Sequence, residues 1–214
     1  MRFNTVLFDL DGTLTDPALG ITNSVVYALR KDGRPVEERE KYLCFIGPPL
    51  HNSFKKYCGA TDEEATRLIR YYREYFADKG IFENGVYDGI PELLAELKNR
   101  GTRLILATAK PELFMHQIME RFDLAQYFDF MAGCTIDEKR AEKEEVIAYV
   151  LETQGITDLS NVAMVGDREN DIRGARLNGI TAVGVLFGYG SREELVSAGA
   201  ELLAETPRQL LEIL

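Results

Sequence analysis

Acidic side chains follow two apolar segments of this chain at spacings that could assemble a reactive site. Asp9 and Asp11 come directly after the apolar run 3–8, and Asp167 and Asp171 follow a second such run. Clustered carboxylates repel one another unless a cation or a proton neutralises them. Oxygen ligands without nearby histidine or cysteine favour a hard ion, Mg²⁺ before Zn²⁺. These aspartates therefore predict a magnesium site.

A hydroxyl group and two basic side chains lie at corresponding places in the sequence. Thr108 and Lys110 follow the apolar run 103–107, and Lys143 lies near the start of a predicted helix, 141–154. In open parallel sheets, ligands bind at the carboxyl ends of the strands. We therefore expect one edge of a sheet to gather carboxylates, a hydroxyl group and cations.

The elements that must position these residues alternate along the chain. Apolar, β-branched runs predict strands at 3–8, 103–107, 128–132, 161–165 and 180–186. Helical spacing predicts helices at 91–100, 111–121, 141–154, 170–178, 192–198 and 207–213. Strands that alternate with helices predict an α/β fold, a doubly wound parallel sheet with a Rossmann-like core and helices on both faces.

The segment 16–83 departs from this alternation and predicts an all-helical insertion after the first strand. Helical spacing covers 19–31 and 50–57, and Thr61 with Glu64 forms a capping-box pattern that opens a helix reaching about residue 79. We therefore expect a catalytic core of residues 1–15 and 84–214 and a helical cap of residues 16–83. Acidic and basic side chains balance within 16–83, so the acidic excess lies in the core.

Composition limits the classes of partner. The 214 residues carry a net charge of −10, which argues against a nucleic-acid polymer or an anionic membrane as partner. The apolar run 3–8 is too short for a signal peptide, and no stretch approaches the roughly 20 apolar residues of a membrane span. The three cysteines have no metal-ligand spacing. We therefore expect a cytoplasmic protein.

Taken together, the candidate site residues resemble a known family. The pattern resembles the four motifs of the haloacid dehalogenase superfamily, in the same order and over nearly the whole chain. The matching residues are Asp9-x-Asp11-x-Thr13, Thr108, Lys143 and Gly166-Asp167-x-x-x-Asp171. The insertion 16–83 resembles the cap of that superfamily. The segments 9–16, 45–50 and 108–111 are most similar to its phosphoglycolate phosphatase and 5′-nucleotidase-like branch, although Ala109 stands where relatives often have serine or asparagine.

The resemblance implies catalytic roles for Asp9, Asp11, Thr108 and Lys143. Asp9 is the expected nucleophile, whose carboxylate attacks phosphorus and forms an aspartyl-phosphate. Asp11 is expected to protonate the leaving alkoxide and then to deprotonate the attacking water. Lys143 would neutralise the nucleophile and the phosphate, and Thr108 would donate a hydrogen bond to a phosphoryl oxygen.

The same resemblance implies a metal site and a substrate site. Mg²⁺ would be held by Asp9, by the backbone carbonyl of Asp11 and by Asp167, while Asp171 would bind a metal-ligated water or orient Lys143. The residues expected to bind substrate are Leu10, Thr108, Ala109, Lys110 and Lys143 in the core, with Gly47, Pro48 and His51 in the cap.

The resulting expectation is Mg²⁺-dependent hydrolysis of a small phosphomonoester, of the phosphoglycolate or nucleoside 5′-monophosphate type, through an aspartyl-phosphate. A phosphomutase of the β-phosphoglucomutase type would use the same aspartate pair and cap. A non-catalytic phospho-acceptor or binding module would also place an aspartate cluster on a parallel sheet, but it needs neither Asp11 as an acid nor an inserted cap.

Overall fold

The computed structural model describes residues 3–136 and 140–214. The chain divides into two compact units: the first comprises residues up to Thr15 together with Val86–Leu214, and the second comprises Asp16–Gly85. At the two crossings between the units, strand β2 (Thr15–Asp16) pairs with strand β3 (Gly85–Val86). Within the described residues, no helix is long and apolar enough to cross a membrane.

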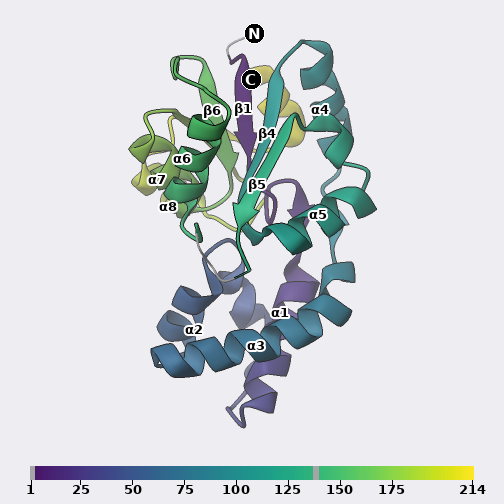
Figure 1. Ribbon diagram of the computed structural model, residues 1–214, viewed down its shortest axis with the longest axis vertical. Coiled ribbons are helices and arrows are strands. Elements are labelled where there is room, and N and C mark those ends of the chain that lie inside the picture. The colour runs from purple at the N-terminus through teal and green to yellow at the C-terminus, as the bar shows by residue number, and fades with distance from the viewer. Residues whose placement is uncertain (1–2, 137–139) are drawn as a thin grey trace. The chain divides into compact units, whose positions relative to one another are not determined.

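The first unit is built on a parallel sheet, as predicted. Among its described residues the sheet has six strands in the order β5-β4-β1-β6-β7-β8 (Figure 1). These strands are β1 (Thr5–Phe8), β4 (Arg103–Pro111), β5 (Phe130–Cys134), β6 (Val162–Gly166), β7 (Thr181–Val185) and β8 (Leu202–Ala204). All four residues of β1 are buried, which is typical of a central strand covered on both faces.

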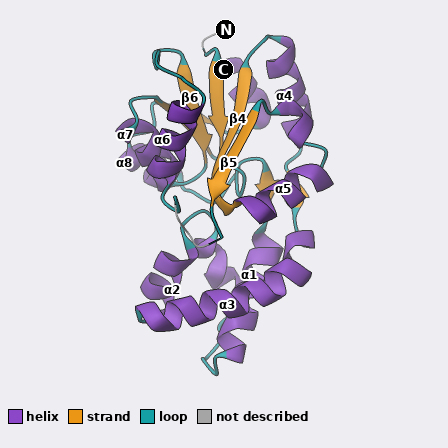
Figure 2. Ribbon diagram, in the orientation of Figure 1, coloured by secondary structure: helices purple, strands orange, loops and turns teal. Residues whose placement is uncertain are grey.

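Helices cover both faces of this sheet (Figure 2). One group comprises α4 (Ile90–Asn99), α5 (Glu112–Arg121) and α9 (Pro207–Ile213), with the short helix η3 (Ala125–Tyr127) beside α4 and α5. The other group comprises α6 (Lys143–Thr153), α7 (Glu169–Leu177) and α8 (Arg192–Ala198). Leu7 of β1, Met164 of β6 and Ile147 of α6 belong to one buried cluster, so the apolar strand faces hold the helices in place.

The sheet differs from the sequence predictions in two places. The second predicted strand was expected to end at residue 107, but β4 continues to Pro111. Its register with β5 shifts between Ala107 and Pro111, so the intervening residues form an irregular stretch like a β-bulge, which side-chain periodicity does not reveal. Strand β8 was not predicted, because three residues at a sheet edge are too short to show a period.

The second unit contains the predicted helices. Its elements are α1 (Ala18–Lys31), η1 (Arg39–Phe45), α2 (Leu50–Cys58), α3 (Asp62–Asp78) and η2 (Gly80–Phe82). The predicted capping box is confirmed: Thr61 Oγ1 accepts from Glu64 N at 3.3 Å, and Glu64 Oε2 accepts from Thr61 N at 2.8 Å. This reciprocal pair fixes the start of α3.

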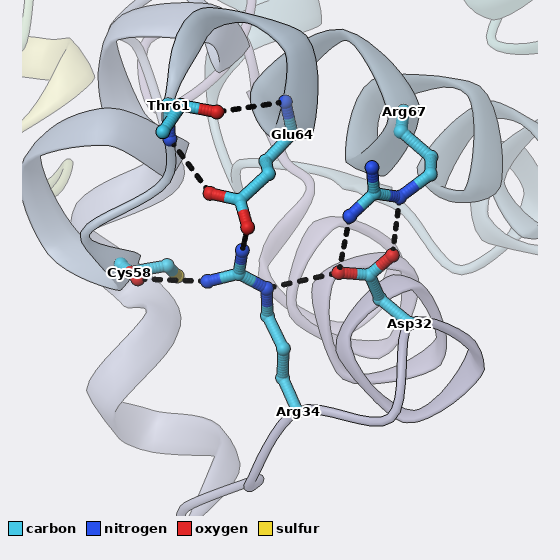
Figure 3. A network of polar contacts seen from close by, with 6 residues as sticks. All are labelled: Asp32, Arg34, Cys58, Thr61, Glu64 and Arg67. Carbon is cyan, nitrogen blue, oxygen red and sulfur yellow. Dashed lines mark hydrogen bonds and ion pairs between the residues drawn. The ribbon is translucent and has the colours of Figure 1, made fainter.

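A polar network joins the end of α1 to the helices that follow it (Figure 3). Arg67 donates to both carboxylate oxygens of Asp32, at 2.6 Å from Nε to Oδ1 and 3.2 Å from Nη2 to Oδ2. Arg34 Nε lies 2.9 Å from Asp32 Oδ2, and its Nη2 lies 2.7 Å from Glu64 Oε1. The hydrogen bond from Arg67, followed by that from Arg34, outweighs burial and holds the pKa of Asp32 below its ordinary value.

Asp32→Asn is expected to lower the free energy of unfolding of this unit by about 1 to 2 kcal/mol, because a neutral amide cannot satisfy two guanidinium groups. The folded-state pKa of Asp32 is lowered. The stabilisation is therefore present above the ordinary aspartate pKa of about 4 and is lost as the pH falls through the lowered value. Urea unfolding of both proteins across this pH range measures the difference.

Glu37→Gln is the matched control, because Glu37 pairs with Lys41 where both side chains are at least 60% exposed. Its expected effect is below about 0.5 kcal/mol. Equal effects of the two substitutions would show that the Asp32 network does not stabilise the unit.

Candidate active site

The loop after β1 carries two buried aspartates. Asp9 N donates to Val165 O at 2.9 Å, which continues the sheet pairing one residue beyond β1. Gly12 then turns the chain with a positive φ of 87°, and Thr15 N donates to Leu10 O at 3.0 Å. The side chains of Asp9 and Asp11 are thereby held, buried, at the carboxyl end of the central strand.

The end of the neighbouring strand β6 contributes the other two aspartates. Asp167 follows Gly166 directly and is fully buried. A side chain at Gly166 would place its Cβ 2.2 Å from Asp171 Cγ, so only glycine leaves room for the carboxylate behind it. Asp171 lies in the first turn of α7, where its Oδ2 accepts from Arg168 N at 3.1 Å.

Lys143, the first residue of α6, is buried between these two loops. Its Nζ lies 2.6 Å from Asp9 Oδ1 and 2.9 Å from Asp171 Oδ1, and it donates to Ala107 O at 3.1 Å. Burial lowers the pKa of the Lys143 ammonium, but the carboxylates of Asp171 and Asp9 outweigh burial and raise its pKa above the ordinary value. Lys143 therefore stays charged beside Asp9.

Asp9, Asp167 and Asp171 together offer a site that fits a divalent cation. One carboxylate oxygen from each lies within 4.8 Å of the others. Burial raises the pKa of Asp167 well above its ordinary value, and the charges of Asp171 and Asp9 raise it further. Burial likewise raises the pKa of Asp171, to about 6, against the opposing charge of Lys143. A hard cation would relieve this concentration of negative charge, and oxygen donors suit Mg²⁺.

Asp11 points its side chain elsewhere and is not one of the clustered carboxylates. Its carboxylate pairs through Oδ2 with Lys110 Nζ, from the irregular end of β4. Burial raises the pKa of Asp11, while the charge of Lys110 opposes the shift. Any role of Asp11 toward a metal would therefore fall to its backbone carbonyl, and that role stays a prediction.

The other predicted substrate contacts divide between the two units. In the first unit, Thr108 and Leu10 are buried and Ala109 is partly exposed. Thr108 Oγ1 accepts from Lys110 N at 3.3 Å. In the second unit, the segment before α2 contains Gly47, with a positive φ of 99°, and Pro48. His51 lies in the first turn of α2, where its Nε2 is 3.6 Å from Asp62 Oδ1. Their contacts with substrate stay predictions.

A loop that the sequence reasoning did not identify braces Asp167. After β7, Tyr189 N donates to Asp167 Oδ2 at 2.8 Å, and Thr13 Oγ1 lies 3.4 Å from Oδ1. A Cβ at Gly188 would lie 2.2 Å from Gly12 O, and a Cβ at Gly190 would lie 1.9 Å from Asp167 O. The available signal was a Gly-Tyr-Gly sequence after a predicted strand, since glycines in such loops permit close backbone approach.

Gly188→Ala is expected to reduce the affinity of this carboxylate cluster for Mg²⁺ by about 10- to 100-fold, the range measured for outer-shell partners of metal ligands. The added methyl group must displace the loop, which withdraws the Tyr189 hydrogen bond from Asp167. Isothermal titration with Mg²⁺ measures the affinity directly. Gly85→Ala is the control, because among the described residues no atom beyond its two chain neighbours lies within 4 Å of the added Cβ. Unchanged affinity in Gly188→Ala would contradict the bracing role.

One family model and several known proteins match most of this chain. Residues 6–185 match the sequence model of the family described as haloacid dehalogenase-like hydrolase. A 5′-nucleotidase from Pseudomonas aeruginosa is 42% identical over 195 residues, which cover 91% of this chain and 88% of that protein. Tyrosine-protein kinase PtkA from Mycobacterium tuberculosis is 40% identical over 86% of this chain and 62% of that protein. The crystal structure of a "predicted phosphatase" from Clostridium acetobutylicum matches with a TM-score of 0.96 and 48% identity, over 99% of this chain and 97% of that one.

Proposed function

Because the chain belongs to the haloacid dehalogenase-like hydrolase family, we propose that it is a Mg²⁺-dependent phosphatase of small phosphomonoesters that acts through an aspartyl-phosphate on Asp9. The observation that carries this proposal is the buried group formed by Asp9, Asp167, Asp171 and Lys143. Burying so many like charges opposes folding unless cations compensate them, and such clusters are found preferentially at functional sites. The site therefore supports catalysis better than a structural role.

The residues divide the work of phosphoryl transfer between them. The Asp9 carboxylate is the nucleophile, and the Lys143 ammonium beside it reduces its repulsion of the phosphate. Asp11 gives a proton to the departing ester oxygen and later takes one from the attacking water. Thr108 and the backbone amides near Leu10, Asp11 and Ala109 would hold phosphoryl oxygens.

A metal ion would complete this arrangement. Asp9 and Asp167 would hold Mg²⁺ together with the Asp11 carbonyl, and Asp171 would bind a metal-ligated water or orient Lys143. Bound there, Mg²⁺ supplies positive charge that stabilises the phosphoryl group during transfer. Tyr189 and Thr13 fix the direction in which Asp167 presents its oxygens.

The proposed contacts of the core residues are with the phosphate group alone. The insertion 16–83 would therefore select the remainder of the substrate. Gly47, Pro48 and His51 are its proposed contacts. The relative from Pseudomonas aeruginosa is named a 5′-nucleotidase, which favours nucleoside 5′-monophosphates as the first substrates to test. The segments 45–50 and 108–111 resemble the phosphoglycolate phosphatase and 5′-nucleotidase-like branch, which makes phosphoglycolate the second substrate to test.

A substrate panel tests the proposal. Purified protein is assayed for phosphate release from nucleoside 5′-monophosphates, phosphoglycolate and sugar phosphates, with Mg²⁺ and with excess EDTA. We expect turnover that EDTA abolishes and Mg²⁺ restores. Release of phosphate that EDTA does not affect would contradict the metal requirement, and no release from any ester would contradict the phosphatase.

Other fates of the phosphoryl group are separated within the same panel. A phosphomutase would convert a sugar phosphate to its isomer with the help of a bisphosphate activator, so release of inorganic phosphate without that activator would favour the phosphatase. A phospho-acceptor module would bind Mg²⁺ and phosphate without turnover. Because one relative is named a tyrosine-protein kinase, ATP with a tyrosine peptide is included, and phosphotyrosine without ester hydrolysis would overturn the proposal.

A further inference from the structure

Lys110 is a buried cation that the proposed chemistry leaves without a role. It lies in the irregular end of β4, next to β1 in the sheet, and its Nζ pairs with Oδ2 of Asp11. The two side chains are only 6% and 11% exposed. Burying an ammonium group requires compensation by an opposite charge, and this carboxylate provides it.

The two oxygens of Asp11 differ in their surroundings. Oδ2 is anchored by Lys110, whereas Oδ1 is buried and accepts no hydrogen bond from the described residues. A buried carboxylate oxygen without a donor is uncommon in folded proteins and is found at functional sites. The carboxylate is therefore fixed through one oxygen and open at the other.

We propose that Lys110 is a positioning residue that holds Asp11 through Oδ2, so that Oδ1 exchanges the proton during catalysis. This inference rests on the proposed function. In the first step the Asp9–phosphorus bond forms, the bond from phosphorus to the ester oxygen breaks, and that oxygen takes the proton from Asp11 Oδ1. In the second step water attacks phosphorus, the Asp9–phosphorus bond breaks, and the water proton returns to Oδ1. The proton moves only between Asp11, the ester oxygen and water.

This role differs from the substrate contact that the sequence suggests for Lys110. A phosphate contact would act on every phosphomonoester alike, because all of them carry the same group. Removing a residue that acts through Asp11 slows the reaction more when the leaving group depends more strongly on protonation. An alkyl alcohol needs protonation to depart, whereas p-nitrophenolate departs without it.

The test compares Lys110→Met with the unmodified enzyme on an alkyl phosphomonoester and on p-nitrophenyl phosphate. The parameter is kcat/KM, which includes the steps up to formation of the aspartyl-phosphate. We expect a loss of about 100-fold on the alkyl ester, the lower range for general acid catalysis. On p-nitrophenyl phosphate the loss should stay below about 5-fold, because departure of that group does not require the proton. The inhibition constant of inorganic phosphate should be unchanged.

Two further variants keep the inference testable should Lys110→Met fold poorly. Lys110→Gln retains a hydrogen-bond donor and should recover part of the alkyl-ester activity. In the Asp11→Asn background, Lys110→Met should cause almost no additional loss, because a residue that acts only through Asp11 has nothing left to position.

The outcomes distinguish the inference from the function on which it rests. Equal losses of kcat/KM on both esters would overturn the positioning role. It would also be overturned if Lys110→Met lowered kcat/KM as strongly in the Asp11→Asn background as in the unmodified enzyme. A weaker inhibition constant for phosphate would instead establish Lys110 as a phosphate contact. If the unmodified protein hydrolysed neither ester, the proposed function itself would fail, and this inference with it.

Discussion

Asp9→Asn is expected to abolish phosphate release, with a loss in kcat of at least about 10⁴-fold, while the protein remains folded. The amide lacks the charge and the nucleophilicity of the carboxylate that must attack phosphorus. Asparagine has nearly the same shape as aspartate, and Lys143 keeps its second partner, Asp171, at 2.9 Å. The backbone at position 9 also keeps its sheet hydrogen bond to Val165.

The measurement is phosphate release at saturating substrate, with thermal unfolding as the test of folding. Asp9→Ala is assayed in parallel, because deamidation of an asparagine at this position would regenerate the nucleophile. Asp129→Asn, which alters the half-exposed pair with Lys98, is the control and should retain full activity. Activity above one tenth of the unmodified level in Asp9→Ala would remove Asp9 as the nucleophile.

Lys143→Met is expected to have the second-largest effect, on both activity and stability. It removes the ammonium group that lies 2.6 Å from Asp9 and 2.9 Å from Asp171. The buried carboxylates then lose their compensating charge, which lowers the free energy of unfolding by about 3 kcal/mol or more. We expect kcat to fall by about 10³-fold, since both the nucleophile and the phosphate lose a neutralising partner.

Added Mg²⁺ should restore part of the lost stability but little of the activity, because a second cation can neutralise the carboxylates without replacing the ammonium at Asp9. Urea unfolding with and without Mg²⁺ measures this. Lys98→Met, which removes a lysine from the half-exposed pair with Asp129, is the matched control with an expected change below about 1 kcal/mol. Equal destabilisation by both substitutions, or full activity of Lys143→Met, would contradict the role of Lys143.

Much of the fold follows from periodicity, and the exceptions have physical reasons. The helix that begins after Thr61 was predictable because capping residues and amphipathic spacing point to the same start. The extension of β4 to Pro111 was not, because its register with β5 depends on a bulge that exists only in the assembled sheet. Helix η1 lacks a period that would distinguish it from a loop.

The candidate site shows the same division. Asp9, Asp167 and Asp171 could be expected at one edge, because each follows a strand or opens the helix after it. The partners that orient them are contacts between distant parts of the chain. Lys110 and Asp11 are 99 positions apart, and Tyr189 and Asp167 are 22 apart. Which of Asp11's oxygens is anchored depends on side-chain directions that only the folded structure defines.

Covalent trapping tests the central claim most directly. The enzyme is mixed with a phosphomonoester and Mg²⁺, quenched during turnover and reduced with borohydride, which converts an aspartyl-phosphate to homoserine. Peptide mass spectrometry then locates the modified residue. We predict homoserine at position 9 in the unmodified protein, with none formed when substrate is omitted. Homoserine at another aspartate would contradict the account. So would an Asp9 that stays unmodified during turnover, if the Asp9→Ala variant also keeps its activity.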